Sequence, residues 1–410
     1  MVNKIKLPEL LAPAGNFEKM RFAYRYGADA VYLASKKFGM RAAADNFTMQ
    51  ELEDAVAYAR SLNKKVYVTV NIMPHCEDVP DIEPFLNRIE EIRPDAVIVA
   101  DLGVFSLCTK ILKNVEIHIS TQAATVNYLS CRAWHEMGAK RVVLSRELNI
   151  NEIAEIRAKT PKSLELEAFV HGAMCVSFSG RCLLSNFFTG RDANKGACTQ
   201  PCRWEYKFSE VKRESEELTA VVEREGTYIF GSKDMCLIEH IDDLCKCGLD
   251  SLKIEGRMKS AYYTATVTNA YRKAMTAYAA DPEGYKLPNG ILEELDSVSH
   301  REYCTGYYYN NPLFESNLAK NTGYIKEKAF FATVTEYDGK TGLAKCKQRN
   351  KLSLGDTVCV LSPMQKSKSF IVKEMYDLDK NPISSAPHAQ MEFYVKADFP
   401  LNEMDILYGA

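Results

Sequence analysis

Several features are missing from this chain of 410 residues, and each absence excludes a class of protein. No run of about 18 apolar residues is present, so we expect no membrane-spanning helix. The first 15 residues contain lysines and prolines but no long apolar stretch, which argues against a signal peptide and favours a cytoplasmic location. The formal net charge of -2 excludes a generally basic coat for nucleic acid, although it leaves room for a local basic face.

A G-x-G-x-x-G pattern is also absent after the first apolar run, which disfavours a dinucleotide-binding sheet. What is present in the first two thirds is an alternation of helical segments with short apolar runs rich in Val and Ile, typical of parallel strands buried on both faces. The runs lie at residues 10–15, 28–34, 65–72, 95–100, 116–121, 141–145, 164–170 and 251–256. They predict an α/β fold, a TIM-like (β/α) barrel whose closure can be irregular, with a doubly wound open sheet as the alternative.

The character of the sequence changes twice along the chain. Residues 1–280 are predicted to form the barrel domain, which carries the catalytic site and a cysteine-rich loop at 171–206. Pro and Gly then interrupt the pattern, so 281–325 is predicted to be a connector. Short apolar runs separated by turns predict a small antiparallel β-barrel or sandwich over 326–410.

Four of the 13 cysteines fall in the loop, at Cys175, Cys182, Cys198 and Cys202. An odd total in a reducing compartment disfavours a disulfide framework. Structural zinc recruits ligands in closely spaced pairs, and only Cys198 with Cys202 fits that pattern. Four widely spread thiols therefore favour an iron–sulfur cluster, with zinc or incidental thiols as alternatives. Four basic residues near the loop would offset thiolate charge: Arg181, Arg191, Lys195 and Arg203.

The loop starts where the run at 164–170 ends, which in a βα barrel is the catalytic face. Glu167 and His171 lie just ahead of the first loop cysteine. Side chains alternate along a strand, so Glu165, Glu167 and Phe169 share one side. Carboxylates on a buried strand are costly unless they face a site or the barrel interior, although a neighbouring lysine accounts for Glu165 equally well.

Other polar residues converge on the same face if the barrel is correct. They are Arg41, Asn71, His118, Gln122, Lys253, Glu255 and Arg257. Each alone is a weak signal, since a single histidine in a strand is more often a core residue. Lys253 is more informative, because an inward lysine in a buried strand needs an anion. Together with Arg41 and Arg257, it predicts a pocket for a carboxylate-bearing ligand.

Three segments of the sequence carry a resemblance to a known family. "ELLAPAGNFEKMRFAYRYGADAVYLA", "EAFVHGAMCVSFSGRCLLS" and "SLKIEGRMKS" resemble peptidase family U32, the collagenase-like group. The resemblance covers essentially the whole chain, including the C-terminal β domain. The family name implies proteolysis, but the sequence has no H-E-x-x-H motif. The best nucleophile–base pair on offer is Cys175 with His171.

Other members of the family are RNA and quinone hydroxylases that hold an iron–sulfur cluster on four cysteines. "CTQPCRWEY" (198–206) and "GSKDMC" (231–236) are similar to the prephenate-dependent tRNA uridine hydroxylases. This resemblance implies hydroxylation of C5 of the wobble uridine of tRNA, with prephenate as co-substrate. It also implies that the four loop cysteines bind a cluster, of the 4Fe-4S type. The peptidase activity of the family name is the alternative.

The resemblance also implies roles for the candidate site residues. Glu167 and His171 would act as acid–base or positioning groups. Arg41, Lys253 and Arg257 would bind the two carboxylates of prephenate, beside Asn71, His118, Gln122 and Glu255 as further substrate-binding residues. Arg181, Arg191, Lys195 and Arg203 would form a phosphate-binding rim for tRNA, or else a solvated charged face. The C-terminal domain would bind RNA or a partner, or support the barrel.

Overall fold

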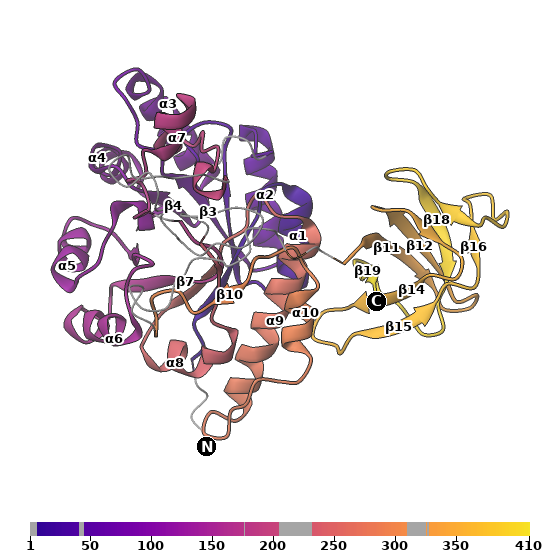
Figure 1. The fold of residues 1–410 in the computed structure, drawn as a ribbon. Helices are drawn as coiled ribbons and strands as arrows, with labels where there is room; N and C mark the ends of the chain where they lie inside the picture. The colour runs from indigo at the N-terminus through magenta and orange to yellow at the C-terminus, as the bar shows by residue number, and fades with distance from the viewer. Residues whose placement is uncertain (1–5, 41–44, 176, 205–231, 310–324, 326–327) are drawn as a thin grey trace, which may run out of the picture.

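The computed structural model describes residues 6–40, 45–175, 177–204, 232–309, 325 and 328–410. Eight parallel strands form a closed barrel with helices outside it (Figure 1). The strands are β1 (Glu9–Pro13), β2 (Ala30–Ala34), β3 (Lys65–Val70), β4 (Ala96–Val99), β5 (Glu116–Ile119), β6 (Arg141–Val143), β7 (Glu165–Ala173) and β9 (Ser251–Ile254). β9 pairs with both β1 and β7 and so closes the barrel. The TIM-like barrel is confirmed, and each predicted apolar run corresponds to one strand.

Most of the helices outside the barrel begin after a residue whose side chain caps them. Thr48 and Asn149 each form a capping box with a glutamate three residues on, which fixes the starts of α2 and α6. The helices around the barrel are α1 (Phe17–Arg25), α2 (Met49–Ser61), α3 (Val79–Ile92), α4 (Leu102–Ile111), α5 (Tyr128–Glu136), α6 (Ile150–Lys159), α8 (Ile241–Lys246) and α9 (Ala261–Ala280). Among the described residues, no helix is both long and apolar enough to cross a bilayer.

The barrel is irregular where β7 ends. The register between β7 and β9 shifts between Phe169 and His171, as at a β-bulge. The last three residues of β7 then pair with an antiparallel strand, β8 (Asp234–Cys236), which pairs in turn with β10 (Tyr303–Cys304). Gly172 has φ +109°, and a Cβ there would lie 2.7 Å from the Glu255 carbonyl oxygen. This position therefore requires glycine.

The cysteine-rich loop follows β7 and contains little regular structure. It holds α7 (Leu184–Thr189) and two 3₁₀ turns, η2 (Ala193–Lys195) and η3 (Pro201–Arg203). Two further 3₁₀ turns, η1 (Thr121–Ala123) and η4 (Ile238–His240), follow β5 and β8. After α9, the chain continues through α10 (Ile291–Asp296). The Met73 N–H donates to the Asn194 carbonyl oxygen at 2.9 Å, which ties the loop to the segment after β3.

The C-terminal domain is a curled antiparallel sheet with a core of its own. Its seven strands lie in the order β15–β14–β19–β11–β12–β18–β16, and a two-stranded sheet pairs β13 with β17. The strands are β11 (Phe330–Asp338), β12 (Leu343–Gln348), β13 (Leu352–Ser353), β14 (Thr357–Leu361), β15 (Lys368–Ile371), β16 (Met375–Tyr376), β17 (Ser385–Ala386), β18 (Glu392–Lys396) and β19 (Ile406–Gly409). The predicted antiparallel β domain is thereby confirmed.

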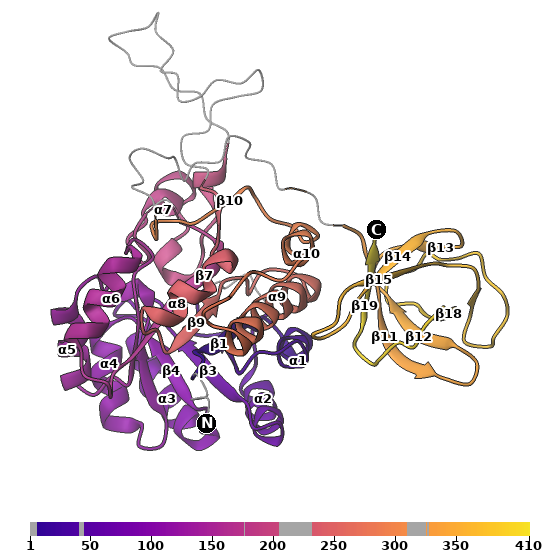
Figure 2. The same cartoon turned by 90° about the horizontal axis from the view of Figure 1, so that it is seen from below.

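The C-terminal domain packs on the side of the barrel formed by α1, α9 and α10 (Figure 2). The Tyr26 hydroxyl, at the end of α1, donates to the carbonyl oxygens of Leu361 (2.8 Å) and Met404 (3.0 Å). The ring of Tyr262 in α9 lies 5.4 Å from the ring of Tyr408 in β19. These contacts are buried, so the two domains share part of one apolar core.

Candidate active site

A pocket of about 110 Å³ lies at the C-terminal ends of the barrel strands; we call it the mouth pocket. Every barrel strand except β1 contributes to it, either directly or through the residues just after the strand. Its lining consists of Tyr32, Met40, Thr69, Asn71, Ile98, Ser120, Thr121, Gln122, Val143, Arg146, Phe169, Cys175, Ser179, Gly180, Lys253, Glu255 and Arg257. Among the predicted substrate-binding residues, the structure brings Asn71, Gln122, Lys253, Glu255 and Arg257 together here.

Buried cations dominate the charge of the mouth pocket. Lys253 Nζ donates to Glu167 Oε1 at 2.7 Å and lies 4.5 Å from the centre of the Tyr32 ring. Burial lowers the pKa of Lys253, and Glu167 opposes that shift. Arg257 is 4% exposed, and its Nη1 donates to Thr69 Oγ1 at 3.4 Å. Cations held in a low-dielectric pocket favour an anionic ligand.

Arg146 is a third cation in the mouth pocket, and our sequence analysis missed it. Its Nη1 donates to the Ala173 carbonyl oxygen at 2.7 Å, and its guanidinium carbon lies 4.0 Å from the centre of the Phe169 ring. Its buried Nε has no hydrogen-bond partner among the described residues. The signal was available, because Arg146 directly follows the apolar run of β6, at the same end of the barrel as the residues that were found.

Neutral hydrogen-bonding groups form another part of the pocket lining. Asn71 Nδ2 donates to Gln122 Oε1, which also accepts from Ser120 Oγ at 3.2 Å. The Met40 N–H donates to Asn71 Oδ1 at 3.3 Å. These bonds fix the orientation of both amides before any ligand binds. Arg41, the next residue along the chain, lies outside the described residues.

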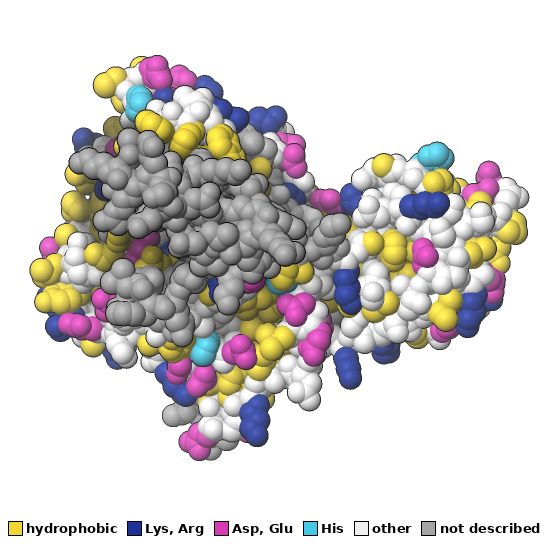
Figure 3. Space-filling model, viewed as in Figure 1, with side chains coloured by type: hydrophobic (Ala, Val, Ile, Leu, Met, Phe, Trp, Pro, Cys, Tyr) yellow, Lys and Arg dark blue, Asp and Glu magenta, His cyan; other side chains and the backbone are white. Residues whose placement is uncertain are grey.

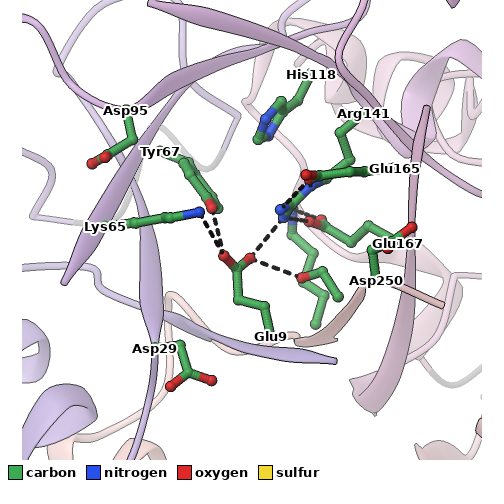
Figure 4. A network of polar contacts seen from close by, with 12 residues as sticks. Glu9, Asp29, Lys65, Tyr67, Asp95, His118, Arg141, Glu165, Glu167 and Asp250 are labelled. Carbon is green, nitrogen blue, oxygen red and sulfur yellow. Dashed lines mark hydrogen bonds and ion pairs between the residues drawn. The ribbon is translucent and has the colours of Figure 1, made fainter. Parts of the chain in front are cut away.

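Glu167 is not part of the lining of the mouth pocket but belongs to a polar network around Arg141 (Figure 4). It is fully buried between two cations: Lys253, and Arg141, whose Nη1 is 2.9 Å from Glu167 Oε2. Burial alone would raise the pKa of Glu167, but the two cations outweigh it and hold the pKa at about 2. Arg141 also binds Glu9 (2.7 Å) and Glu165 (2.7 Å). Glu167 is therefore ionised, and it fixes the position of Lys253.

The two predicted histidines do not line the mouth pocket. His118 is fully buried in the barrel, where its ring packs edge-on to Tyr67 and its Nε2 lies 3.4 Å from Glu116 Oε2. Burial lowers the pKa of His118 despite that carboxylate, so the ring is neutral. Its contacts lie below the mouth, at the level of the Arg141 network (Figure 4).

His171 lies on the outer side of β7. Three tyrosine rings surround it, with centres 6.0 Å (Tyr263), 5.5 Å (Tyr271) and 5.4 Å (Tyr303) away. Neither ring nitrogen has a hydrogen-bond partner among the described residues, which excludes a bond to Cys175. Burial, with His300 and Lys259 nearby, lowers the pKa of His171 to about 3. His171 is a neutral core residue in this structure.

The four loop cysteines line one small cavity of about 70 Å³, the cysteine cavity. It shares Met40, Cys175, Ser179 and Gly180 with the mouth pocket, so the two cavities have a common wall. No three His, Cys, Asp or Glu side chains in the described ranges stand around one point as metal ligands do. In the described residues the four thiols therefore line one cavity without being arranged as the ligands of a metal ion. Cys236 lies in β8 and is not part of the lining.

The donor chemistry of the cysteine cavity fits a thiolate-bound cluster. Its lining, as far as the structure describes it, contains four thiols and the thioether of Met40, with no carboxylate and no imidazole. The Gln200 N–H donates to Cys198 Sγ at 3.4 Å, a contact that stabilises a thiolate. Fixed N–H groups of this kind tune the reduction potential of a thiolate-bound cluster.

The residues of the predicted basic rim differ in whether they already form an ion pair. Lys195 Nζ forms an ion pair with Glu77 at 2.7 Å. Arg181 and Arg191 are exposed, and neither forms an ion pair within the described part of the chain. The side chain of Arg203 lies outside the described residues. Among the described side chains of this rim, Arg181 and Arg191 are therefore the ones that form no ion pair and can contact a phosphate.

Comparison with known proteins identifies what the chain is similar to. Residues 15–318 match the family described as Peptidase family U32, and residues 326–407 match the Peptidase family U32 C-terminal domain. A "tRNA hydroxylation protein" of Bacillus subtilis is 39% identical, over 97% of this chain and 94% of its own. A protein so named in Escherichia coli is 35% identical, over 93% and 91%. A "Collagenase" of Porphyromonas gingivalis is 30% identical, over 87% and 86%.

Proposed function

This chain belongs to peptidase family U32, and from that membership and the geometry of its mouth we propose that it is a tRNA-modifying enzyme. The proposed reaction is hydroxylation of C5 of the wobble uridine, with prephenate as co-substrate and an iron–sulfur cluster on the four loop cysteines. One observation carries the proposal: the cationic mouth pocket and the cysteine cavity share a wall. The names of the relatives that match nearly the whole chain support it.

The mouth pocket suits a dicarboxylate. Arg146, Lys253 and Arg257 place three cations around it, and Glu255 is the one carboxylate in the described lining. A hydrogen bond between a charged pair contributes about 1.5–3 kcal/mol, so two carboxylates shared among three cations give substantial binding. Glu167 keeps Lys253 in place from below. The amides of Asn71 and Gln122 then remain for the neutral groups of a substrate.

The cysteine cavity would hold the cluster through Cys175, Cys182, Cys198 and Cys202. A bound cluster supplies one-electron chemistry or a binding point for a ligand next to the reacting base. The protein's own residues do the rest. Gly180 has φ +78°, and its Cα approaches so closely that a Cβ would lie 2.8 Å from the Gln122 carbonyl oxygen. This contact holds the loop, and with it Cys175, against the mouth.

A tRNA substrate must present its uridine unstacked, because the mouth pocket lies among the ends of the barrel strands, where a stacked base cannot reach. Bases in loops leave the stack at low cost, and proteins that act on single bases use this. Arg181 and Arg191 would contact the flanking phosphates. A role for the C-terminal domain in RNA binding stays a prediction, since its buried contacts with α1 and α9 equally support a structural role.

Peptide hydrolysis is the second candidate, favoured by the family name and by the relative named collagenase. It requires a nucleophile with a base, or a metal-bound water. Cys175 has no bond to His171, which is enclosed by tyrosines. Within the described residues the geometry therefore supplies no nucleophile–base pair from the two predicted partners.

The first test concerns the cluster. We would purify the protein without oxygen and measure iron, acid-labile sulfide and the visible spectrum. Cys182→Ala should lose all three signals, whereas Cys236→Ala, a matched change outside the cysteine cavity, should keep them. A colourless protein, or one that contains zinc, would contradict the cluster.

The second test concerns the reaction. Cells that lack this protein should lose 5-hydroxyuridine from their tRNA, as measured by mass spectrometry of tRNA nucleosides. The wild-type chain and Cys236→Ala should restore the nucleoside, and Cys182→Ala should not. A chain that leaves the nucleoside unchanged but cleaves denatured collagen, with the cleavage lost in Cys175→Ala, would replace this proposal with the peptidase.

A further inference from the structure

A second pocket lies beside the mouth pocket, and nothing in the proposed reaction accounts for it. This side pocket has a volume of about 510 Å³ and is lined by Ala124, Glu147, Ser177, Phe178, Arg181 and Tyr307. Its lining comes from the segments after β5, β6, β7 and β10, so it is built by the same strand ends that form the mouth. Its volume is sufficient for a nucleobase with its sugar.

The chain order shows how closely the two pockets adjoin. Gln122 lines the mouth pocket, and Ala124, two residues on, lines the side pocket. Likewise Arg146 lines the mouth pocket and the next residue, Glu147, lines the side pocket. The cysteine loop runs between them, with Ser179 and Gly180 facing the mouth and Phe178 and Arg181 facing the side pocket. A polymer that inserts one unit into the mouth therefore has its adjacent unit next to the side pocket.

The lining of the side pocket matches the groups of a nucleotide. Phe178 is 46% exposed and Tyr307 is half-buried, so both rings can offer a face to a base. Burial and the nearby Glu147 raise the pKa of Tyr307, which keeps the phenol neutral. Arg181 forms no ion pair within the described ranges and supplies a cation at the rim. Aromatic faces beside an uncommitted arginine are the usual means of holding unpaired bases.

Glu147 adds a preference among bases. Its Oε2 accepts a hydrogen bond from Ser145 Oγ, which fixes the carboxylate at the pocket wall. A carboxylate is an acceptor only, and it pairs with the exocyclic amino group of a base, as it does with N4 of cytosine. A base that presents a carbonyl oxygen at the same position would face the carboxylate charge and be disfavoured.

Figure 3 shows hydrophobic side chains gathered on the upper part of the barrel, over α3 and α7, with Lys and Arg side chains bordering them. The most exposed large apolar side chains of the described chain lie here, Phe187 at 81% and Leu183 at 69%. Phe187 does not line the side pocket. It therefore offers a matched control for Phe178, in the same loop and with the same side chain.

We propose that the side pocket binds the base of the nucleotide adjacent to the target nucleotide, stacked against Phe178 and Tyr307, with preference for a base that carries an exocyclic amino group. The inference rests on the proposed function, because it takes an RNA strand as the occupant. It extends that function by naming the residues that read the neighbouring nucleotide. Arg181 contacts the phosphate and does not discriminate among bases.

The test is a double-mutant cycle between protein and RNA. The protein is the full chain with its cluster, purified without oxygen, and the ligand is a fluorescent anticodon hairpin. Its target uridine is intact, and the nucleotide on either the 5′ or the 3′ side is made abasic in turn. Stacking contributes about 1–3 kcal/mol per base, so one of the two abasic hairpins should bind about 10-fold more weakly to the wild type.

Phe178→Ala should bind the intact hairpin about 10-fold more weakly and should show no further loss with that abasic hairpin. Phe178 also borders the cysteine cavity, whereas Tyr307 lines only the side pocket. Tyr307→Leu is therefore a second test variant, and it should show the same weaker binding and the same lack of further loss as Phe178→Ala. Phe187→Ala should retain the wild-type response to the abasic nucleotide. Glu147→Gln should bind hairpins with either neighbouring base but discriminate less between cytosine and uracil.

The results distinguish a failure of the proposed function from a failure of this inference alone. If the wild-type protein does not bind the hairpin at all, the proposed function fails and this inference fails with it. If the wild type binds but neither abasic hairpin binds more weakly, the side pocket reads no neighbour and only this inference is overturned. It is likewise overturned, alone, if the losses from Phe178→Ala and the abasic nucleotide add fully. Capture of a peptide in the side pocket, in competition with the hairpin, would also overturn it.

Discussion

The buried ion pair between Glu167 and Lys253 should be one of the strongest single contributions to the stability of the barrel. The perturbation is Glu167→Gln, which removes the charge while keeping the size of the side chain. Lys253 then remains 4% exposed, without its carboxylate. Arg141 is less affected, because it retains Glu9 and Glu165.

The magnitude follows from the pKa of Glu167. Folding lowers it from an ordinary 4.5 to about 2. At 1.36 kcal/mol per unit, the ionised carboxylate contributes about 3 kcal/mol at neutral pH. Removing one partner of a buried pair costs about 3–5 kcal/mol in general, so the two values agree. With an unfolding entropy of about 2.1 cal/mol/K per residue over 410 residues, the loss lowers Tm by about 4 °C.

The stabilisation contributed by the Glu167 carboxylate should depend on pH in a defined direction. A carboxylate with a lowered pKa stabilises the fold fully above its unfolded value, and this contribution is lost as the pH falls through the folded value. The difference in unfolding free energy between wild type and Glu167→Gln should therefore be constant from about pH 7 to about pH 5. It should narrow as the pH falls from about 5 towards 3.

The assay is urea unfolding followed by circular dichroism. Lys253→Met should also destabilise the barrel, and the double variant should cost clearly less than the sum of the single variants. Glu155→Gln breaks the exposed pair with Lys159, 2.6 Å long, and should cost little, because solvent screens an exposed pair. The reasoning is refuted if Glu167→Gln costs no more than Glu155→Gln, or if the two buried changes are additive.

Three further predictions follow from the site and the domain interface. Arg146→Met should raise the KM for the dicarboxylate at least 10-fold with a smaller change in kcat, since it removes a charged hydrogen bond worth about 1.5–3 kcal/mol; steady-state kinetics measure both. Tyr26→Phe removes the hydroxyl that donates to one buried and one part-buried carbonyl oxygen and should destabilise the domain interface by about 1–3 kcal/mol, seen as faster proteolysis between the domains. His171 has its pKa lowered from 6.5 to about 3, so wild-type stability should fall by about 1.4 kcal/mol per unit as the pH drops below 6.5. His171→Phe should lose this contribution and show a shallower slope, because buried His118, whose pKa is also lowered, still contributes. Urea unfolding across this pH range compares the two proteins.

The barrel could be predicted because its physical signal is local. A strand buried on both faces is mostly apolar, and the four residues of β4 are apolar and buried without exception. The polar residues that follow such strands were therefore placed at the mouth correctly. Arg146 obeys the same rule and was overlooked, so its omission was not a limit of the sequence.

The positions of the Glu167 and His171 side chains could not be predicted in the same way. Alternation along β7 correctly places Glu165, Glu167 and Phe169 on the inner side, but it would place His171 there too. The bulge after Phe169 breaks the alternation and turns His171 outward. Glu167 does not line the pocket because it forms ion pairs with Arg141 and Lys253. These residues lie on strands far apart in the sequence, and the periodicity of one strand carries no information about such contacts.

The closure of the barrel by β9 has a consequence for how the protein is made. Strands β1 to β7 pair with their neighbours in the chain, but Ser251 in β9 bonds to Glu9 across 242 residues. Contacts of such long range form late in folding, and a ribosome supplies β9 only after the whole cysteine-rich loop. The thiols are therefore synthesised before Lys253, Glu255 and Arg257 can complete the mouth beside them. The nascent chain passes through a stage in which its four cysteines are present and not yet enclosed, and this is when they are most open both to metal delivery and to oxidation.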